Sequence, residues 1–198
     1  MKYIEICGNI ASGKTTLVRK LFVKDSLKIY ENFETNPFYS AFYQNPLEYS
    51  FETEITFFLQ HYHAIKIKKN HNGFSICDYS LLLDLAYADV NLTGTRHRIF
   101  VQIFEEVHQE IGPPESIINL ICPGNVLLER IKTRNREAES SITINYLENI
   151  SQAINYRIKT FSSKTNIIHI NSDLIDFRKS SSKSKLENIL ETQFINEK

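Results

Sequence analysis

The sequence predicts an α/β fold of three layers, in which a five-stranded parallel sheet is flanked by helices. Short apolar segments rich in isoleucine alternate with longer segments that have helical periodicity. Such continuous apolar runs are typical of strands that helices cover on both faces. A chain of 198 residues is long enough to build one such sheet with its covering helices. We therefore expect a single domain over residues 1–198, without an internal repeat.

The expected elements follow one another in regular alternation. Strands are expected at residues 3–7, 27–31, 74–78, 117–122 and 167–170. Helices are expected at residues 13–23, 46–69, 81–90, 96–111, 125–134 and 145–162. The segment Gly112-Pro113-Pro114 stops a helix before the fourth strand. Residues 179–185, KSSSKSK, are expected to form a flexible loop, and residues 186–198 a terminal helix.

Composition excludes several classes of partner. The formal net charge is +0, so no overall basic field would recruit nucleic acid or an anionic membrane. No apolar run is long enough to span a bilayer, and the chain enters its first strand without a signal-peptide pattern. The three cysteines are widely spaced in apolar runs and form no metal-binding pair, which predicts buried, reduced thiols. We expect a cytoplasmic protein.

A phosphate-binding motif follows the first strand. Residues 8–15, GNIASGKT, fit G-x-x-x-x-G-K-[ST] at every fixed position and open the first helix. The motif predicts the fold of P-loop NTPases and an ATP site in which Lys14 reaches the β- and γ-phosphates and Thr15 binds Mg²⁺. A chance glycine turn is the alternative, but both flanks argue against it. The expected ATP-binding residues of the loop are Gly8, Asn9, Ile10, Ala11, Ser12, Gly13, Lys14, Thr15 and Thr16.

Two weaker patterns support a nucleotide site. Asp78 ends the third strand, where an acidic residue can support the metal or cap the next helix, and this stretch does not choose between the two. Arg130, Arg134 and Arg136 occupy a helix-to-loop segment. By themselves they would suggest a solvated helix end, but beside a phosphate loop they favour a lid near residues 130–140 that closes over a triphosphate and excludes water.

The chain resembles the deoxynucleoside kinases, and most closely their bacterial deoxyadenosine/deoxyguanosine kinase branch. The resemblance runs from the phosphate loop to about Phe177 and includes ENFETNPFYSAFYQNPLEYSFETE, the pattern R-x-R-x-x-E and a late Asp176-Phe177. It implies transfer of the γ-phosphoryl group of ATP, with Mg²⁺, to the 5′-hydroxyl of a deoxynucleoside in nucleotide salvage. Deoxyadenosine or deoxyguanosine is the favoured acceptor. It also implies a homodimer through residues 81–90 and 96–107.

The resemblance assigns roles on the acceptor side. Glu31 matches the general base, and a carboxylate there can take the proton of the 5′-hydroxyl. Tyr43 and Glu139 match the pair that holds the 3′-hydroxyl. Glu54 replaces a glutamine that reads the base edge; an ionised glutamate only accepts hydrogen bonds, so we expect it to disfavour thymidine. For each, a solvated or packed side chain is the plainer alternative.

The remaining assignments complete the expected site. Arg134 and Arg136 join Lys14 and Glu31 as catalytic residues, because they can stabilise the transferring charge. Arg130, Arg134, Asp176 and Phe177 are expected to contact ATP, and Asp78 to contact both metal and substrate. Several aromatic residues could stack on the base, although core packing is the default for most of them: Phe33, Phe38, Phe42, Tyr49 and Phe57.

One departure from the family pattern leaves alternatives open. The third strand ends in Asp78-Tyr79-Ser80, where relatives usually carry an arginine in the middle position. A lid arginine such as Arg136 could substitute, activity could be low, or the chain could be a non-catalytic, nucleotide-binding kinase-like subunit. A nucleoside monophosphate kinase is disfavoured because residues 31–60 contain no arginine for an acceptor phosphate. His61 and His63 are expected as polar lining or surface, since their spacing does not suit a metal site.

Overall fold

The computed structural model describes residues 2–21, 26–68, 74–161 and 165–179. The helix expected over 186–198 and almost all of the loop expected over 179–185 lie outside the described residues, as do the last residues of three other expected helices.

The described chain forms the expected five-stranded parallel sheet. The strands are β1 (Lys2–Gly8), β2 (Ser26–Ile29), β3 (Phe74–Cys77), β4 (Ser116–Ile121) and β5 (Asn166–Asn171), in the order β2-β3-β1-β4-β5. All four strand pairs are parallel. The predicted strands are confirmed, with ends within two residues of those expected.

Seven α-helices and two short 3₁₀ helices connect the described strands. They are α1 (Lys14–Lys20), η1 (Phe33–Thr35), α2 (Tyr39–Gln44), α3 (Pro46–Ile67), α4 (Leu81–Asn91), α5 (Gly94–Ile111), α6 (Gly124–Arg134), η2 (Glu137–Ser141) and α7 (Ile144–Phe161). The predicted long helices are confirmed. The elements η1, α2 and η2 were not predicted, because segments of three to six residues show no helical period.

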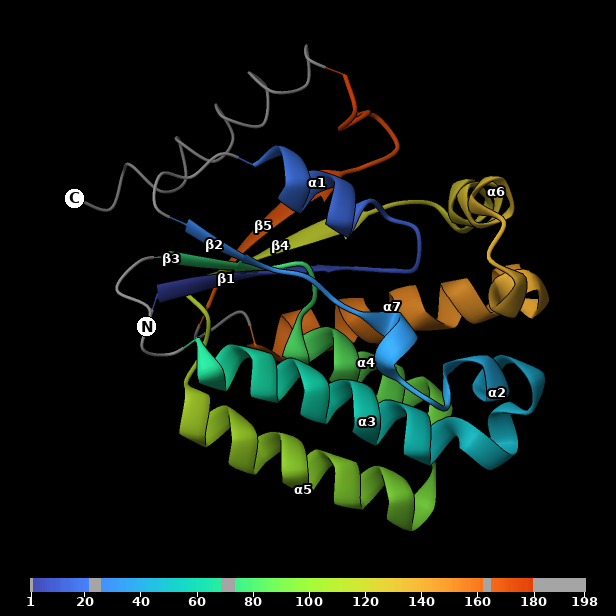
Figure 1. Cartoon of the computed structure of the whole chain (residues 1–198), viewed down its shortest axis with the longest axis horizontal. Coiled ribbons are helices and arrows are strands. Elements are labelled where there is room, and N and C mark those ends of the chain that lie inside the picture. Colours follow the sequence, from blue (N-terminus) through green and yellow to red (C-terminus); the bar gives the residue numbers. More distant parts are fainter. Residues whose placement is uncertain (1, 22–25, 69–73, 162–164, 180–198) are drawn as a thin grey trace.

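Helices cover both faces of the sheet, which gives the three layers (Figure 1). On one face, Leu17 and Val18 of α1 pack against isoleucines of the central strands. On the other face, α4 and α7 lie against the sheet, with α3 and α5 alongside them (Figure 1). The isoleucine-rich strands are therefore apolar on both sides, as their sequences predicted.

The described residues test two of the predictions made from composition, on the cysteines and on membrane-spanning segments. Cys7, Cys77 and Cys122 are all buried free thiols, as expected. None of the helices in the described ranges has both the length and the apolar character needed to cross a membrane.

Candidate active site

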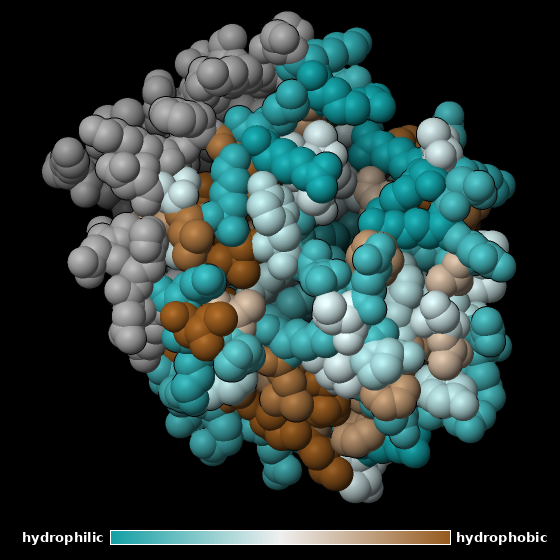
Figure 2. Space-filling view, in the orientation of Figure 1, coloured by the Kyte–Doolittle hydropathy of each residue, from teal (hydrophilic) through white to brown (hydrophobic). Residues whose placement is uncertain are grey.

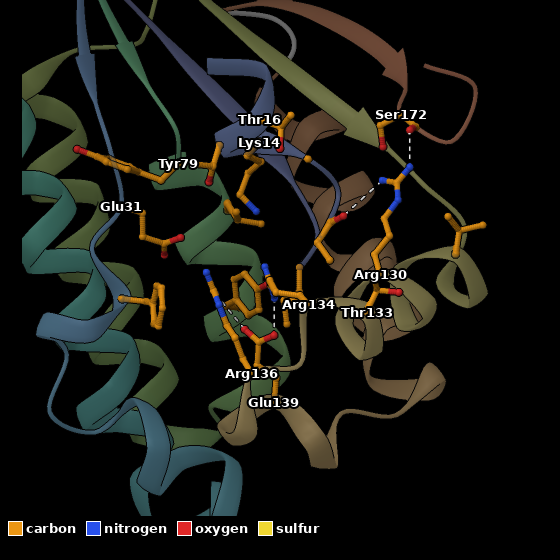
Figure 3. A pocket seen from close by; sticks show the side chains of 18 of the residues that line it. Lys14, Thr16, Glu31, Tyr79, Arg130, Thr133, Arg134, Arg136, Glu139 and Ser172 are labelled. Carbon is orange, nitrogen blue, oxygen red and sulfur yellow. Dashed lines mark hydrogen bonds and ion pairs between the residues drawn. The ribbon is translucent and has the colours of Figure 1, made fainter. Parts of the chain in front are cut away.

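The site lies at the edge of the sheet where the parallel strands end. A cavity of about 920 Å³ opens there between the phosphate loop, the segment after β2, helix α3 and the region of α6 and η2. Figure 2 shows hydrophilic residues gathered around a hollow on this face. Figure 3 shows Lys14 and Glu31 on facing walls, with Arg134, Arg136 and Glu139 below them.

The phosphate loop has a backbone that its glycines make possible. Gly8 and Gly13 have φ values of 140° and 105°, which residues with a Cβ atom rarely adopt. A Cβ on Gly8 would lie 2.8 Å from Oγ of Ser12 and 2.9 Å from the carbonyl oxygen of Leu120. Gly13 precedes helix α1, so the loop delivers its amides and the positive end of the helix dipole to one place.

Asn9 anchors this loop to helix α7. Its Nδ2 donates to the carbonyl of Leu147 at 2.7 Å and to Oγ of Ser151 at 2.9 Å, while its Oδ1 accepts from the amide of Ile10 at 2.7 Å. The ammonium of Lys14 lies across the loop and donates to the carbonyls of Gly8 at 2.9 Å and Asn9 at 3.2 Å. The loop is thus held from below by a buried amide, with a cation on its open side.

Asp78 lies beneath the cavity, next to Thr15. Its side chain is almost fully buried, at 1% exposed, and neither carboxylate oxygen has a hydrogen-bond partner within the described chain. Burial raises the pKa of Asp78 to about 6, and the Thr15 hydroxyl opposes that rise. Unpaired buried carboxylate oxygens beside a hydroxyl are suited to a hard cation. The described residues contain no cluster of three or more His, Cys, Asp or Glu that could hold a metal by themselves.

Glu31 follows β2 and faces the cavity from the wall opposite the loop. About a third of its side-chain surface is exposed, at 34%, and its Oε1 lies 3.6 Å from Nε2 of His61. Burial would raise the pKa of Glu31, but His61, Lys14 and Arg136 together hold the pKa below its ordinary value. The site therefore presents an ionised carboxylate at neutral pH.

Arginines from α6 and the following segment reach the cavity as a lid would. Arg130 donates to the carbonyl of Ser172 at 2.7 Å and, at 3.4 Å, to those of Ala11 and Ser12, which fastens α6 to the phosphate loop. Arg134 and Arg136 lie nearer to Glu31 (Figure 3).

Glu139, in η2, is the buried centre of a polar cluster. It forms ion pairs with Arg134 and, at 3.2 Å, with Arg136. The hydroxyl of Tyr39 donates to its Oε1 at 2.5 Å. Tyr43, which the sequence pairs with Glu139, lines the same cavity and meets the ring of Tyr39 edge-on, with centroids 5.3 Å apart. Tyr39 thus joins the expected pair, a residue that the sequence reasoning missed.

Glu54 lines the cavity from α3 and is nearly fully buried. Asn91 of α4 donates from Nδ2 to its Oε1 at 2.7 Å and also to the hydroxyl of Tyr146 at 3.0 Å. Burial raises the pKa of Glu54 to about 8. A carboxyl that is protonated at neutral pH can donate as well as accept, so the acceptor-only character expected of Glu54 applies only above about pH 8.

The last expected residues lie at the rim of the loop and in α2. Phe177 is buried next to Gly13, with its ring 3.2 Å from where a Cβ on that glycine would be. Asp176 pairs with Arg178, which holds the pKa of Asp176 at about 2. Phe42 is buried and lines the cavity, edge-on to Tyr43.

The sequence predicted the location of His61 only in general terms. It was expected as polar lining or surface; the structure buries it in the cavity wall, whereas His63 is exposed. Its spacing from Glu54 was a usable signal, because seven residues are two helical turns and place both side chains on one face of α3. Its partner Asp84, on α4, carried no such signal.

Comparisons with known proteins agree with this geometry. The family model described as "Deoxynucleoside kinase" matches residues 4–196. Deoxyguanosine kinase of Bacillus subtilis is 28% identical over 183 residues, covering 88% of each chain. Deoxyadenosine kinase of Dictyostelium discoideum is 28% identical over 181 residues, covering 88% of this chain and 74% of that protein.

Solved structures show the same fold. A structure of deoxyadenosine kinase from M. mycoides with bound dCTP matches with a TM-score of 0.82 at 20% identity, over 96% of this chain and 99% of that one. The same kinase with bound dATP matches with a TM-score of 0.79 at 22% identity and the same coverage. The predicted P-loop fold with a five-stranded parallel sheet is therefore confirmed.

Proposed function

The chain belongs to the deoxynucleoside kinase family, which makes it an ATP-dependent phosphotransferase, and we propose that its acceptor is the 5′-hydroxyl of deoxyadenosine or deoxyguanosine. The observation that carries this proposal is that one cavity holds the phosphate loop and Lys14 on one side and the ionised Glu31 on the other. Relatives named deoxyguanosine kinase and deoxyadenosine kinase support a purine acceptor. We place the reaction in nucleotide salvage.

On the donor side, the loop amides and Lys14 would bind the β- and γ-phosphates of ATP. Arg130 already fastens α6 to the loop, so Arg134 and Arg136 are carried close to the transferring group. The rim residues Asp176 and Phe177 would contact the rest of the nucleotide. Residues 130–140 act as the lid of a single domain over residues 1–198.

Magnesium fits the residues below the loop. The Thr15 hydroxyl and the unpaired Asp78 carboxylate would hold Mg²⁺. When bound there, the ion would neutralise charge that develops on the β- and γ-phosphates. Asp78 also interacts with Glu31, so we expect it to influence the acceptor end of the site as well.

On the acceptor side, Glu31 takes the proton of the 5′-hydroxyl while that oxygen bonds to the γ-phosphorus and the bond to the β-phosphate oxygen breaks, releasing ADP. Positioning and electrostatics supply most of such catalysis. Glu139, with Tyr39 and Tyr43, would hold the 3′-hydroxyl. Glu54 would read the base edge, and Phe42 would help to shape the base pocket.

The proposal extends to the state of the protein in the cell. We place it in the cytoplasm as a homodimer that contacts neither nucleic acid nor membrane. The balanced net charge supports the absence of those two partners. The dimer would use α4 and α5, and α5 exposes Ile99 on its surface.

A coupled ATP-consumption assay with the four common deoxynucleosides and their monophosphates tests the acceptor. We expect turnover with purine deoxynucleosides, and Glu31→Gln should lower kcat by about 100-fold or more because the base is lost. Glu34→Gln, at an exposed neighbouring carboxylate, is the matched control and should leave kcat unchanged. Nucleotide binding without turnover would indicate a non-catalytic subunit, and turnover of monophosphates alone would indicate a different kinase class.

A further inference from the structure

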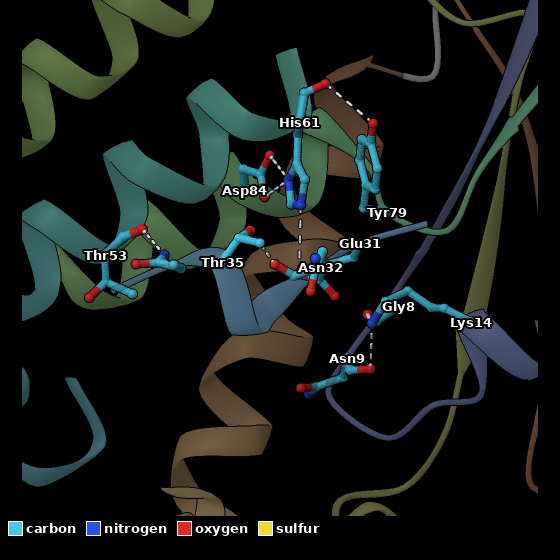
Figure 4. Close-up of polar contacts among 11 residues, drawn as sticks. Gly8, Asn9, Lys14, Glu31, Asn32, Thr35, Thr53, His61, Tyr79 and Asp84 are labelled. Carbon is cyan, nitrogen blue, oxygen red and sulfur yellow. Dashed lines mark hydrogen bonds and ion pairs between the residues drawn. The ribbon is translucent and has the colours of Figure 1, made fainter. Parts of the chain in front are cut away.

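A histidine lies between two carboxylates at the acceptor end of the cavity. Nδ1 of His61 is 2.8 and 3.0 Å from the two carboxylate oxygens of Asp84, and its Nε2 is 3.6 Å from Oε1 of Glu31. The three residues come from α3, α4 and the segment after β2 (Figure 4). One imidazole therefore links the helical layer to the proposed general base.

The Nε2 atom is directed at the reacting end of the cavity. His61 is only 5% exposed, yet its Nε2 has no hydrogen-bond partner within the described chain. Because Asp84 accepts a hydrogen bond from Nδ1, the open nitrogen is the one nearest Glu31. The imidazole thus contacts Asp84 closely through Nδ1 and forms a longer ion pair with Glu31 through Nε2.

Aromatic packing fixes the plane of the ring. Tyr79 stacks on the imidazole with centroids 3.9 Å apart and an interplanar angle of 10°, and Phe57 lies on it at 5.9 Å and 27°. The hydroxyl of Tyr79 also donates to the backbone carbonyl of His61 at 3.2 Å. Tyr79 is the residue in the middle of Asp78-Tyr79-Ser80, so the departure from arginine at this position supplies the flat face on which His61 rests.

The surrounding charges favour a cationic ring. Besides Asp84 and Glu31, the carboxyls near His61 are Glu5 of β1 and Glu54 of α3, and Lys14 of α1 interacts with both Glu31 and Asp84. Burial alone would lower the pKa of His61, but Asp84 and then Glu31 raise it to about 10. Conversely, His61 is the main group that holds the pKa of Glu31 down.

We propose that His61, held by Asp84 and stacked on Tyr79, is a positioning residue whose Nε2 holds the Glu31 carboxylate directed toward the acceptor hydroxyl. The inference rests on the role proposed for Glu31. In this arrangement Tyr79 provides the flat surface on which the imidazole stacks. His61 adds a cation from α3 to the cations that Arg134 and Arg136 supply.

The pH profile of kcat/KM tests this in the full chain. In His61→Gln, which keeps a neutral donor near Nε2, we expect the acidic limb to move up by about one pH unit, because Glu31 loses its cation. At pH 7 kcat should fall about tenfold or more while KM for ATP stays within about twofold. His63→Gln, on the same helix but exposed, should leave the profile unchanged.

A merely structural role predicts a different result. If His61→Gln lowers the midpoint of urea unfolding but its acidic limb coincides with that of the natural chain, the proposal is wrong. The same holds if the loss is entirely in KM for ATP.

A measurement without turnover keeps the inference separate from the proposed function. With isotopically labelled histidine, NMR should show both ring nitrogens of His61 protonated at pH 8, and Glu31→Gln should lower its titration midpoint by about one pH unit. A neutral His61 at pH 8, or a midpoint indifferent to Glu31→Gln, would overturn the inference. If no nucleoside is phosphorylated, the proposed function fails while this titration still decides whether His61 and Glu31 are coupled.

Discussion

Replacing Glu54 with glutamine should stabilise the protein more as the pH rises. Glu54 is buried in α3, and the side-chain amide of Asn91 donates to its Oε1 at 2.7 Å. Glutamine has nearly the same shape and keeps a carbonyl oxygen to accept from Asn91, so the packing and this hydrogen bond should survive. The substitution removes only the ability to ionise.

The magnitude follows from the two protonation states. The carboxyl ionises near pH 4.5 when unfolded and near pH 8 in the folded chain, because burial raises the pKa of Glu54. Below pH 4.5 the carboxyl is protonated in both states, so the full contribution of Glu54 to stability is present. Between the two values only the unfolded state releases it, which costs the folded state about 1.4 kcal/mol per pH unit. From pH 5 to pH 8 we therefore expect the advantage of Glu54→Gln to grow by about 3 kcal/mol.

Urea unfolding followed by far-UV circular dichroism measures this directly, since the chain has no tryptophan for fluorescence. Other buried carboxyls titrate too, but they are common to both proteins and cancel in the difference. Glu48→Gln, at an exposed site on the same helix, is the control. Its free energy of unfolding should differ from that of the natural chain by the same amount at every pH. A gain from Glu54→Gln that does not change between pH 5 and pH 8 would show that Glu54 is already ionised when folded, and the reasoning would fail.

Three further substitutions separate the loop, the lid and the metal. Asn9→Ala removes the amide that links the loop to α7, so the free energy of unfolding measured in urea should fall by about 1–3 kcal/mol, and KM for ATP should rise. An unchanged KM would mean that the loop keeps its conformation without Asn9. Glu139→Gln weakens the grip on the 3′-hydroxyl, so the preference for deoxyadenosine over its 2′,3′-dideoxy analogue in kcat/KM should shrink about tenfold; an intact preference would remove Glu139 from the sugar site. Asp78→Asn should raise the Mg²⁺ concentration for half-maximal rate about tenfold, and EDTA should abolish turnover of the natural chain; activity that survives EDTA would exclude the metal role.

The sheet was predictable because its signal is local and repeated. Each strand is a short segment in which apolar residues predominate, and each long helix has a helical period, so five strands and six helices could be placed from the sequence. The short elements α2 and η2 escaped because one or two turns carry no period. They matter all the same, since α2 presents Tyr39 and η2 presents Glu139 to one another from positions 100 residues apart.

The site was predictable where backbone chemistry dictates the residue. Only glycine fits at the fixed glycine positions of the loop, since a Cβ on Gly8 would lie 2.8 Å from Oγ of Ser12. A sequence motif could therefore identify these positions. The partnerships of Glu54 with Asn91 and of His61 with Asp84 could not be read, because they join different helices and depend on how α3 packs on α4. Ionisation was also beyond the sequence: the letter E at position 54 does not reveal that burial keeps the carboxyl neutral near pH 7.

The distribution of charge argues for an uncharged acceptor. Arg134 and Arg136 are paired with Glu139, Arg130 donates to backbone carbonyls, and His61 is paired with Asp84 and Glu31. These cations near the acceptor end therefore already have partners. The wall beyond Lys14 presents Glu31, which is ionised at neutral pH. An acceptor phosphate placed there would bring its negative charges against that carboxylate, and such like-charge contacts are costly in a cavity with restricted water. A nucleoside brings only hydroxyls and a base, which the carboxylate and the protonated Glu54 can bind as hydrogen-bond partners.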